Sequence, residues 1–309
     1  SIAAVFAVGA SAAEFKAGTY TAKAPGIHGD VTVTVTFTKD KIADVKVTHS
    51  ETPGIGSKAA ELLPGRIVER QSPQVDGVTG ATITSTAIRT AVADTVKQAG
   101  ADPAALVPLA VKKQAKNETV DTDVVVVGGG GAGMSATIRT RMNGLNVVLV
   151  EKMPFIGGAA SISGGQVVAQ GSKLQKAFGV TDDSVESMVK DFQANGHNLN
   201  DLSKLTLYAK NVGPTIDWLH DQVGVKFIPN DLPFLAEYSH RRALEFQGGA
   251  GTMAQHLREV IGSNGAKVLF NTRVEKLIVE DGKVTGVEAV DGNTGTKYTI
   301  RAKKTLLTT

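Results

Sequence analysis

The sequence predicts a small α+β domain followed by an α/β domain built on a parallel sheet. Strict alternation from Val31 to Thr38, apolar on one face and threonine on the other, is typical of a strand with one buried side. The run Val124–Val127, a glycine-rich turn and a second apolar run from Asn146 to Val150 give the order of a β-α-β unit. The length of 309 residues agrees with two domains.

The first domain is predicted to be a hairpin followed by a helix. Lys39-Asp40-Lys41 forms the turn, and the alternation resumes from Ile42 to Val47, which makes the hairpin antiparallel. The helix is predicted from Thr86 to Gly100, with Thr84 or Ser85 as its N-cap. Its apolar face holds Ile88, Val92, Val96 and Ala99.

Residues 101–120 are predicted to link a first domain over 14–100 to a second over 121–309, because they lack sustained periodicity. In the second domain, helical patterns cover Ala132–Met142 and Asp182–Val223. Later strands and their turns are predicted at Val268–Phe270, Leu277–Val279, Asp281-Gly282, Val284–Val290, Asp291-Gly292, Tyr298–Ile300 and Lys304–Thr309. A chain ending in that last strand would leave a sheet edge unpaired, so this domain is expected to be incomplete at its C-terminus.

The composition excludes several kinds of site. The chain has no cysteine, which rules out disulfides, thiolate metal sites, iron–sulfur clusters and cysteine-attached haem. Its six histidines include no pair at helical ligand spacing, so no metal site is predicted. The formal charge of +3 is spread without basic runs, so no nucleic-acid partner is expected. Any redox chemistry would need flavins or nicotinamide.

Residues 1–13 are predicted to be the remnant of a secretion signal. The apolar run Ile2–Val8 is followed by small residues that fit cleavage after Ala12 or Ala13. A frayed N-terminal helix is the alternative. The run is far shorter than the roughly twenty apolar residues that span a bilayer. We therefore expect a periplasmic or otherwise secreted protein without stable membrane insertion.

The strongest local motif is Asp76-Gly77-Val78-Thr79-Gly80-Ala81-Thr82, directly ahead of the predicted helix. Gly80 and Ala81 are small enough for a phosphate to approach Thr82, and a helix start offers unpaired N–H groups and a positive dipole end to an anion. The alternative interpretation is a threonine-rich turn that caps the helix.

This motif resembles the flavinylation motif of FMN-binding domains, in which the last threonine is esterified to the FMN phosphate. The resemblance extends to Tyr20–Ala22, to the turn Gly26–Gly29 and to His49–Gly54. It implies covalent FMN, attached as a phosphoester at Thr82 by a flavin transferase. Asp76 would either assist that transferase or simply start the turn.

A second motif, G-x-G-x-x-G, is formed by Gly128, Gly130 and Gly133, with Ala132 inside it. Alone it would be weak evidence. Here it follows a predicted buried strand, opens a predicted helix, and is answered by Glu151 at the end of the next strand, as in a Rossmann-like dinucleotide fold. A pyrophosphate would lie over the helix start, and Glu151 would accept hydrogen bonds from ribose hydroxyls.

A second glycine cluster, Gly157–Gly165, follows directly and decides between NAD and FAD. It resembles the flavoprotein subunit of the fumarate reductase and succinate dehydrogenase family, where it wraps the flavin. The resemblance resumes at His240-Arg241, at Asn271–Val274 and at 305–309. It implies non-covalent FAD contacted by Lys152, Gly158, Ala159, Ala160, Gly164, Gly165 and the backbone of Val274. The family often has asparagine where Ala159 stands, so one hydrogen bond to the flavin region is expected to be lost.

The order of the two domains behind a secretion signal looks like that of bacterial reductases of α,β-unsaturated carboxylates, such as fumarate and urocanate. The resemblance implies electron flow from an external donor, a quinol-linked cytochrome or similar, through FMN to FAD and then as hydride to a C=C bond. The catalytic residues and the cap domain of that family are expected beyond Thr309. Two alternatives stay open: an FMN electron carrier with a non-catalytic FAD domain, and an FAD-dependent dehydrogenase of the ketosteroid type.

Three basic residues, His240, Arg241 and Arg242, are the remaining candidates for a carboxylate-binding site. An arginine pair suits a carboxylate, but arginines on a surface loop are more commonly just solvated. Trp218, Met188 and Phe192 are predicted to be core residues.

Overall fold

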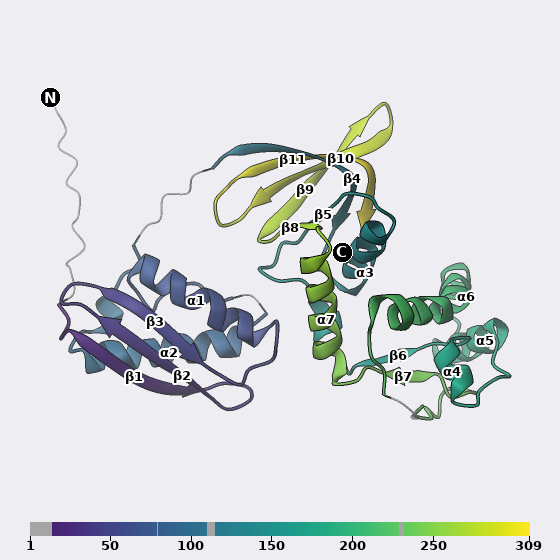
Figure 1. The fold of residues 1–309 in the computed structure, drawn as a ribbon, viewed down its shortest axis with the longest axis horizontal. Coiled ribbons are helices and arrows are strands. Elements are labelled where there is room, and N and C mark those ends of the chain that lie inside the picture. The colour runs from purple at the N-terminus through teal and green to yellow at the C-terminus, as the bar shows by residue number, and fades with distance from the viewer. Residues whose placement is uncertain (1–13, 79, 110–114, 229–231) are drawn as a thin grey trace. The chain divides into compact units, whose positions relative to one another are not determined.

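The computed structural model describes residues 14–78, 80–109, 115–228 and 232–309 (Figure 1). The segment 1–13 lies outside these residues, as do residues 110–114 of the predicted linker. The described chain divides into two compact units. The first holds the described residues up to Glu118, Lys152–Phe155 and Val290–Lys297, and the second holds Thr119–Glu151, Ile156–Ala289 and Tyr298–Thr309.

The first unit is a three-stranded antiparallel sheet, in the order β1-β2-β3, packed against two helices (Figure 1). The helix α2 contacts β1 and β2, α1 contacts β3, and the two helices contact each other. The predicted α+β class is confirmed. Its elements are β1 (Gly18–Pro25), β2 (Asp30–Phe37), β3 (Ile42–Thr48), α1 (Gly56–Arg70), α2 (Thr82–Gln98) and the 3-10 helix η1 (Pro103–Ala105).

The core of this unit follows the predicted alternation. The side chains of Val31, Val33 and Val35 are fully buried and belong to one cluster with Ile88 and Val92 of α2. Their burial between sheet and helix is the main source of stability for such a small unit. On the opposite face of the sheet, threonines pair across strands instead of packing into the core.

The predicted start of the helix is wrong. α2 begins at Thr82 rather than Thr86, and its N-cap is Ala81, which makes no capping hydrogen bond through its side chain. Thr84 and Ser85 lie inside the first turns, because their hydroxyls bind elsewhere: Ser85 accepts from the backbone N–H of Val78 and Thr84 donates to Glu51.

The second unit contains a six-stranded sheet in the order β8-β5-β4-β11-β10-β9. β4 pairs with β5 and β5 with β8, both in parallel. A two-residue turn joins β9 to β10, which makes that pair antiparallel and the sheet mixed. The strands are β4 (Asn117–Val127), β5 (Val147–Val150), β8 (Lys267–Leu269), β9 (Thr272–Glu280), β10 (Lys283–Asp291) and β11 (Lys297–Leu307).

The valine run of β4 is buried on both faces, as predicted. Val124 and Val126 pack with Met134 and Ile138 of a helix, whereas Val125 and Val127 belong to a separate core formed with β5, β10 and β11. The helices of the unit are α3 (Gly131–Met142), α4 (Lys173–Ala177), α5 (Val185–Asn195), α6 (Leu202–Trp218), α7 (Gly249–Ser263), the 3-10 helix η2 (Gly158–Ser161) and the π-helix η3 (Leu219–Val223). A two-stranded sheet of β6 (Gln166–Val168) and β7 (Ala243–Glu245) completes it.

Three details of the strand predictions are wrong. β4 begins at Asn117 and so takes up the end of the predicted linker. The two strands predicted at Tyr298–Ile300 and Lys304–Thr309 are one strand, β11, which lies between β4 and β10 and leaves no open edge there. The connection after Asp291 is longer than the tight turn predicted at Asp291-Gly292, because β11 begins only at Lys297.

Candidate functional site

Thr82 lies at the first position of α2, with its side chain exposed. Gly80, two residues earlier, has a positive φ of 83°, and Ala81 is buried. The N-cap residue of α2, Ala81, makes no side-chain hydrogen bond. The first backbone N–H groups of a helix have no partner within the helix, so they suit an anion. A phosphate on the Thr82 oxygen would therefore meet small residues and a helix start. Thr79 of the motif lies outside the described residues.

The neighbouring hydroxyls are buried and engaged, which distinguishes Thr82 from Thr84 and Ser85. Thr84 donates to the carboxylate of Glu51, a residue the sequence interpretation placed only in a resembling segment. The other Glu51 oxygen accepts from the backbone N–H groups of Ile27, at 2.8 Å, and His28, at 3.1 Å. Glu51 thus ties the turn at 26–29 to the first turn of α2.

The ionised form of Glu51 is stabilised by these contacts. Burial alone would raise the pKa of Glu51, but the hydrogen bonds from Thr84, His28 and Ile27 outweigh it and hold the pKa below its usual value. The stability that ionised Glu51 contributes is therefore fully present at pH values above the ordinary carboxyl pKa. It is lost as the pH falls through the lowered pKa of Glu51.

We expect the turn at 26–29 to open at acidic pH before the rest of the first unit. Below about pH 4, where an ordinary glutamate becomes protonated, Glu51 begins to lose its charge-assisted hydrogen bonds. The protection factors of the Ile27 and His28 amides, which compare the observed hydrogen exchange with the intrinsic rate at the same pH, should fall there in the parent protein. In Glu51→Gln those protection factors should be lower already at pH 7 and change little on acidification. An unchanged exchange rate in the variant would contradict this role.

The second candidate site is the turn Gly128–Gly133, between β4 and α3. The three motif glycines have different structural reasons to lack a side chain. Gly128 has a positive φ of 100°, and a Cβ on Gly133 would collide with the backbone oxygen of Gly128. A Cβ on Gly130 would meet no protein atom within 4 Å. Gly130 therefore leaves open space at the start of α3, where a pyrophosphate can approach the backbone closely.

Glu151 reaches this turn from the end of β5. Its side-chain oxygen accepts a hydrogen bond from the backbone N–H of Gly129 at 2.6 Å, and the residue is 9% exposed. The second glycine segment lies against the same turn: Gly157 donates its N–H to the Gly129 carbonyl at 2.6 Å. The structure thus brings Glu151 and both glycine segments together, as a dinucleotide site requires.

The other predicted contact residues have different surroundings. Ala160 lies next to the glycine turn, 3.2 Å from where a Cβ of Gly131 would be, and Val274 lies on β9, whose first residue bonds the backbone of Glu151. Gly165 packs against the start of α7. The remaining residues are exposed and their roles stay predictions: Lys152, which is grouped with the first unit, Ala132, Gly158, Ala159, Gly164 and, in the other motif, Asp76.

The glycine turn yields a paired prediction. Gly130→Ala should change the stability of the ligand-free protein by less than about 1 kcal/mol, since the new methyl meets no protein atom. It should nevertheless weaken FAD binding, because the methyl occupies the space above the helix start. Gly133→Ala should destabilise the unit by about 3 kcal/mol through overpacking against Gly128. Thermal melts with and without FAD measure both, and equal FAD affinity in Gly130→Ala and parent would contradict the assignment.

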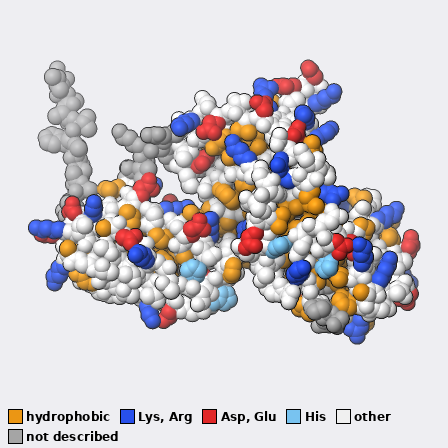
Figure 2. Space-filling view, in the orientation of Figure 1, with side chains coloured by type: hydrophobic (Ala, Val, Ile, Leu, Met, Phe, Trp, Pro, Cys, Tyr) orange, Lys and Arg blue, Asp and Glu red, His pale blue; other side chains and the backbone are white. Residues whose placement is uncertain are grey.

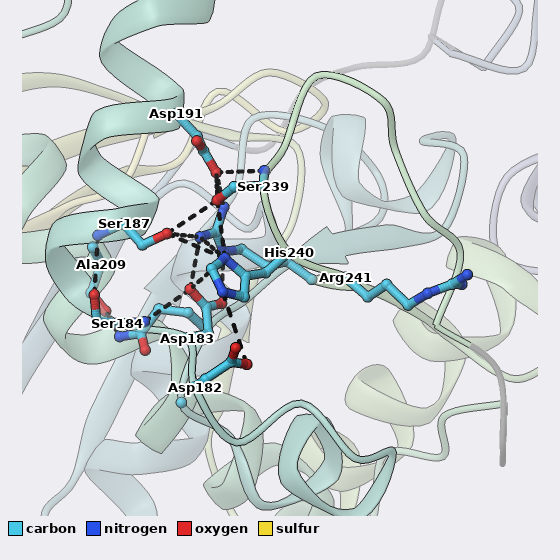
Figure 3. Close-up of polar contacts among 12 residues, drawn as sticks. Asp182, Asp183, Ser184, Ser187, Asp191, Ala209, Ser239, His240 and Arg241 are labelled. Atoms are coloured by element: carbon cyan, nitrogen blue, oxygen red, sulfur yellow. Dashed lines mark hydrogen bonds and ion pairs between the residues drawn. The ribbon is translucent and has the colours of Figure 1, made fainter.

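Arg242 is not a solvated loop residue, contrary to the sequence interpretation. Figure 3 shows the neighbouring residues Asp183, Asp191 and His240. Its side chain is fully buried and forms a bidentate salt bridge with Asp183, in which Nε and Nη2 each donate at 2.7 Å. Its Nη1 donates to Asp191 on α5 at 2.5 Å. His240 contacts the hydroxyls of Ser187 and Ser239 beside it. Since its donors are engaged, Arg242 cannot receive a substrate carboxylate.

Arg241, by contrast, is exposed; it donates to the Leu232 carbonyl and lies over the Phe234 ring. The carboxylates around Arg242 are held ionised. Burial would raise the pKa of Asp183, but bonds from Arg242 and Gln175 outweigh it, and the pKa is lowered. The cluster therefore fastens α5 to the segment before β7.

Other kinds of site are not supported by the described residues. Within the described ranges, no group of three or more histidine, aspartate and glutamate side chains could hold a metal ion. None of the helices in that part of the chain combines the length and apolar character needed to cross a membrane. Figure 2 shows basic and acidic side chains interspersed over the visible face rather than gathered by sign.

Comparisons with known proteins match the chain to two families of flavin-binding domain. The model of the FMN-binding domain matches residues 26–97, and that of the FAD binding domain matches residues 123–309. The chain is 34% identical over 304 residues to the urocanate reductase of Eggerthella lenta, covering 96% of this chain and 50% of that protein. It is 30% identical over 341 residues to the NADH:acrylate oxidoreductase of Vibrio harveyi, covering 91% and 34%.

Among solved structures, the open conformation of a flavocytochrome c3 fumarate reductase matches with a TM-score of 0.55 at 34% identity, over 61% of this chain and 33% of that one. The chain thus spans half or less of the length of these relatives. The FAD binding domain match covers more than half of the chain. The chain therefore belongs to the FAD-binding flavoprotein family that includes fumarate and urocanate reductases, and it joins that FAD-binding domain to an FMN-binding domain.

Proposed function

We propose that this chain belongs to an exported two-flavin reductase, with FMN linked covalently to Thr82 and FAD bound at Gly128–Gly133. Together the two flavins would supply electron transfer from an external donor, a quinol-linked cytochrome or similar, to the C=C bond of an α,β-unsaturated carboxylate. A flavin transferase would attach the FMN. The activities in the names of the relatives, a urocanate reductase, an NADH:acrylate oxidoreductase and a fumarate reductase, support this substrate class.

The observation that carries the proposal is that Thr82 and the glycine turn each lie at a helix start, one within the match to the FMN-binding domain and one within the match to the FAD binding domain. In the first unit, Thr82 is exposed at the first position of α2, where its hydroxyl suits a phosphoester. In the second, Gly130 leaves space above the start of α3 and Glu151 is fixed at the same turn, which suits a dinucleotide. A covalent site and a reversible site in one protein favour a relay of electrons between two centres.

The residues of this chain would bind and orient the cofactors rather than act on the substrate. The start of α3 and the glycine turn would hold the diphosphate through backbone N–H groups. The Glu151 carboxylate would accept from the ribose hydroxyls and would disfavour a 2′-phosphate at that place. Gly157–Gly165 would line the flavin and exclude water from it.

The substrate class is tested by anaerobic reduction of the purified protein followed by addition of fumarate, urocanate, acrylate or cinnamate. At least one of these acids should reoxidise the flavin and be converted to its saturated product. Failure of every acid would contradict the reductase proposal and would favour the electron carrier. Bleaching of oxidised flavin by a saturated substrate alone would instead favour the ketosteroid-type dehydrogenase.

The export proposal rests on the composition of residues 1–13. Protein recovered from the periplasmic fraction or the medium should begin after Ala12 or Ala13, and Edman degradation reads that N-terminus directly. Recovery from the cytoplasm with residues 1–13 intact would contradict it.

A further inference from the structure

Arg258, on α7, makes two contacts at the second glycine segment. Its Nη1 donates to the Ile156 carbonyl at 2.9 Å and approaches the Ser161 hydroxyl at 3.4 Å. Ile156 directly precedes the segment Gly157–Gly165, and Ser161 lies in its middle. A single guanidinium thus contacts the chain on both sides of Gly157–Ala160 from one helix.

The contact is close because Gly157 has no side chain. A Cβ at Gly157 would lie 2.9 Å from Arg258 Nη1 and would overlap the Ser161 hydroxyl, and the φ of Gly157 is 128°. The backbone therefore adopts a conformation that favours glycine and packs directly on the guanidinium. Glycine has the widest backbone freedom, so the contacts of Gly157 with Arg258 and Gly129 help to define the position of the segment.

The position of this segment is transmitted to the glycine turn. The side chain of Ile156 fills the space beside Gly129, where a Cβ would overlap it. Gly157 donates its N–H to the Gly129 carbonyl, and the N–H of Gly129 bonds Glu151. A continuous series of contacts therefore runs from Arg258 through Ile156 and Gly129 to the Glu151 carboxylate.

Arg258 is also a cation held partly out of water. Burial lowers the pKa of Arg258, and the nearby charge of Glu259 acts weakly in the opposite direction. Gln255, one turn earlier on α7, accepts from both Nε and Nη2 at 3.3 Å and fixes the plane of the guanidinium. Holding a desolvated cation in one orientation costs free energy, which the hydrogen bonds to Ile156 and Gln255 help to offset.

We propose that Arg258 is a positioning residue of the FAD site, which sets the second glycine segment against the glycine turn before the cofactor binds. This rests on the FAD site proposed above. Arg258 acts through Ile156 and Ser161, so its loss leaves the fold but loosens the surface that receives FAD. Lysine keeps the charge and can still reach one carbonyl, so it should restore most of the function.

The test measures FAD and ADP affinity for the parent protein, Arg258→Gln and Arg258→Lys, by FAD fluorescence and by ADP competition. Arg258→Gln should weaken FAD at least tenfold, with altered visible circular dichroism of the bound flavin, and Arg258→Lys should remain within about threefold of the parent. Melting of the ligand-free proteins separates this effect from unfolding.

Arg141→Gln is the matched control. Arg141 also donates to backbone carbonyls, those of Asn264 and Leu145, but away from both glycine segments. It should change the melting temperature and leave the FAD affinity of the folded protein within twofold. FAD affinity of Arg258→Gln equal to the parent's, or a loss matched by Arg141→Gln, overturns the inference alone. A parent protein that binds neither FAD nor ADP overturns the FAD site as well.

Discussion

Replacing Arg242 by methionine is expected to destabilise the second unit by about 3–5 kcal/mol, because it leaves the buried carboxylate of Asp183 without its counterion. The side chains of Arg242 and Asp183 are 0% and 2% exposed, so water cannot replace the lost bonds. Asp191, 14% exposed, would lose its 2.5 Å partner as well. Urea unfolding followed by the fluorescence of Trp218, which lies in the same unit, measures the change.

Arg241→Met is the control for this prediction. The Arg241 side chain is exposed and, among the described residues, makes one hydrogen bond, to the Leu232 carbonyl, so its replacement should cost less than about 1 kcal/mol. The lowered pKa of Asp183 and Asp191 means that the parent's advantage is present above the ordinary carboxyl range and is lost as the pH falls through those lowered values. The difference in free energy of unfolding between Arg242→Met and the parent protein should therefore become smaller below about pH 4. Equal stability of the two arginine variants would contradict the buried cluster.

Replacing Thr82 by alanine is expected to abolish the covalent flavin completely while leaving FAD bound. Thr82 is exposed at the first position of α2, so the fold should tolerate alanine there. The neighbouring hydroxyls of Thr84 and Ser85 are buried and hydrogen-bonded, so they cannot take over as acceptors. In-gel flavin fluorescence after denaturation detects the covalent adduct.

Thr86→Ala provides the comparison, since Thr86 is an exposed threonine one turn further along the same helix. It should retain the full covalent signal. Covalent flavin that persisted in Thr82→Ala, or disappeared in Thr86→Ala, would show that the acceptor has been assigned wrongly.

Where a local pattern decides an element, the sequence was sufficient. β2 and β4 follow directly from their apolar spacing, because strand alternation and a continuous valine run state which faces are buried. The sequence analysis does not predict α1, because Pro64 lies inside this helix and proline usually interrupts helices. The signal that could have revealed it is the spacing of Ala59, Leu63 and Ile67, which form a fully buried stripe. β1 was missed because its inward-facing residues are mostly small, and its pairing with β2 fixes it instead.

The same distinction applies to the sites. Gly128, Gly130, Gly133 and Glu151 come from one β-α-β unit, so their spacing in sequence predicts their meeting in space. The cluster around Arg242 joins residues more than fifty positions apart in the chain, as its bonds to Asp183 show. No local sequence pattern predicts an ion pair between residues so far apart. The contacts of Arg258 likewise cannot be predicted from a local pattern, since its partner Ile156 lies about a hundred residues earlier in the chain.

The most direct test of the account is the flavin content of the purified protein before and after acid precipitation. Two flavins of different attachment should be found: one FMN per chain that stays with the pellet on the peptide containing Thr82, and one FAD per chain that is released to the supernatant. A colourless protein, or one that releases all its flavin on denaturation, would contradict the account.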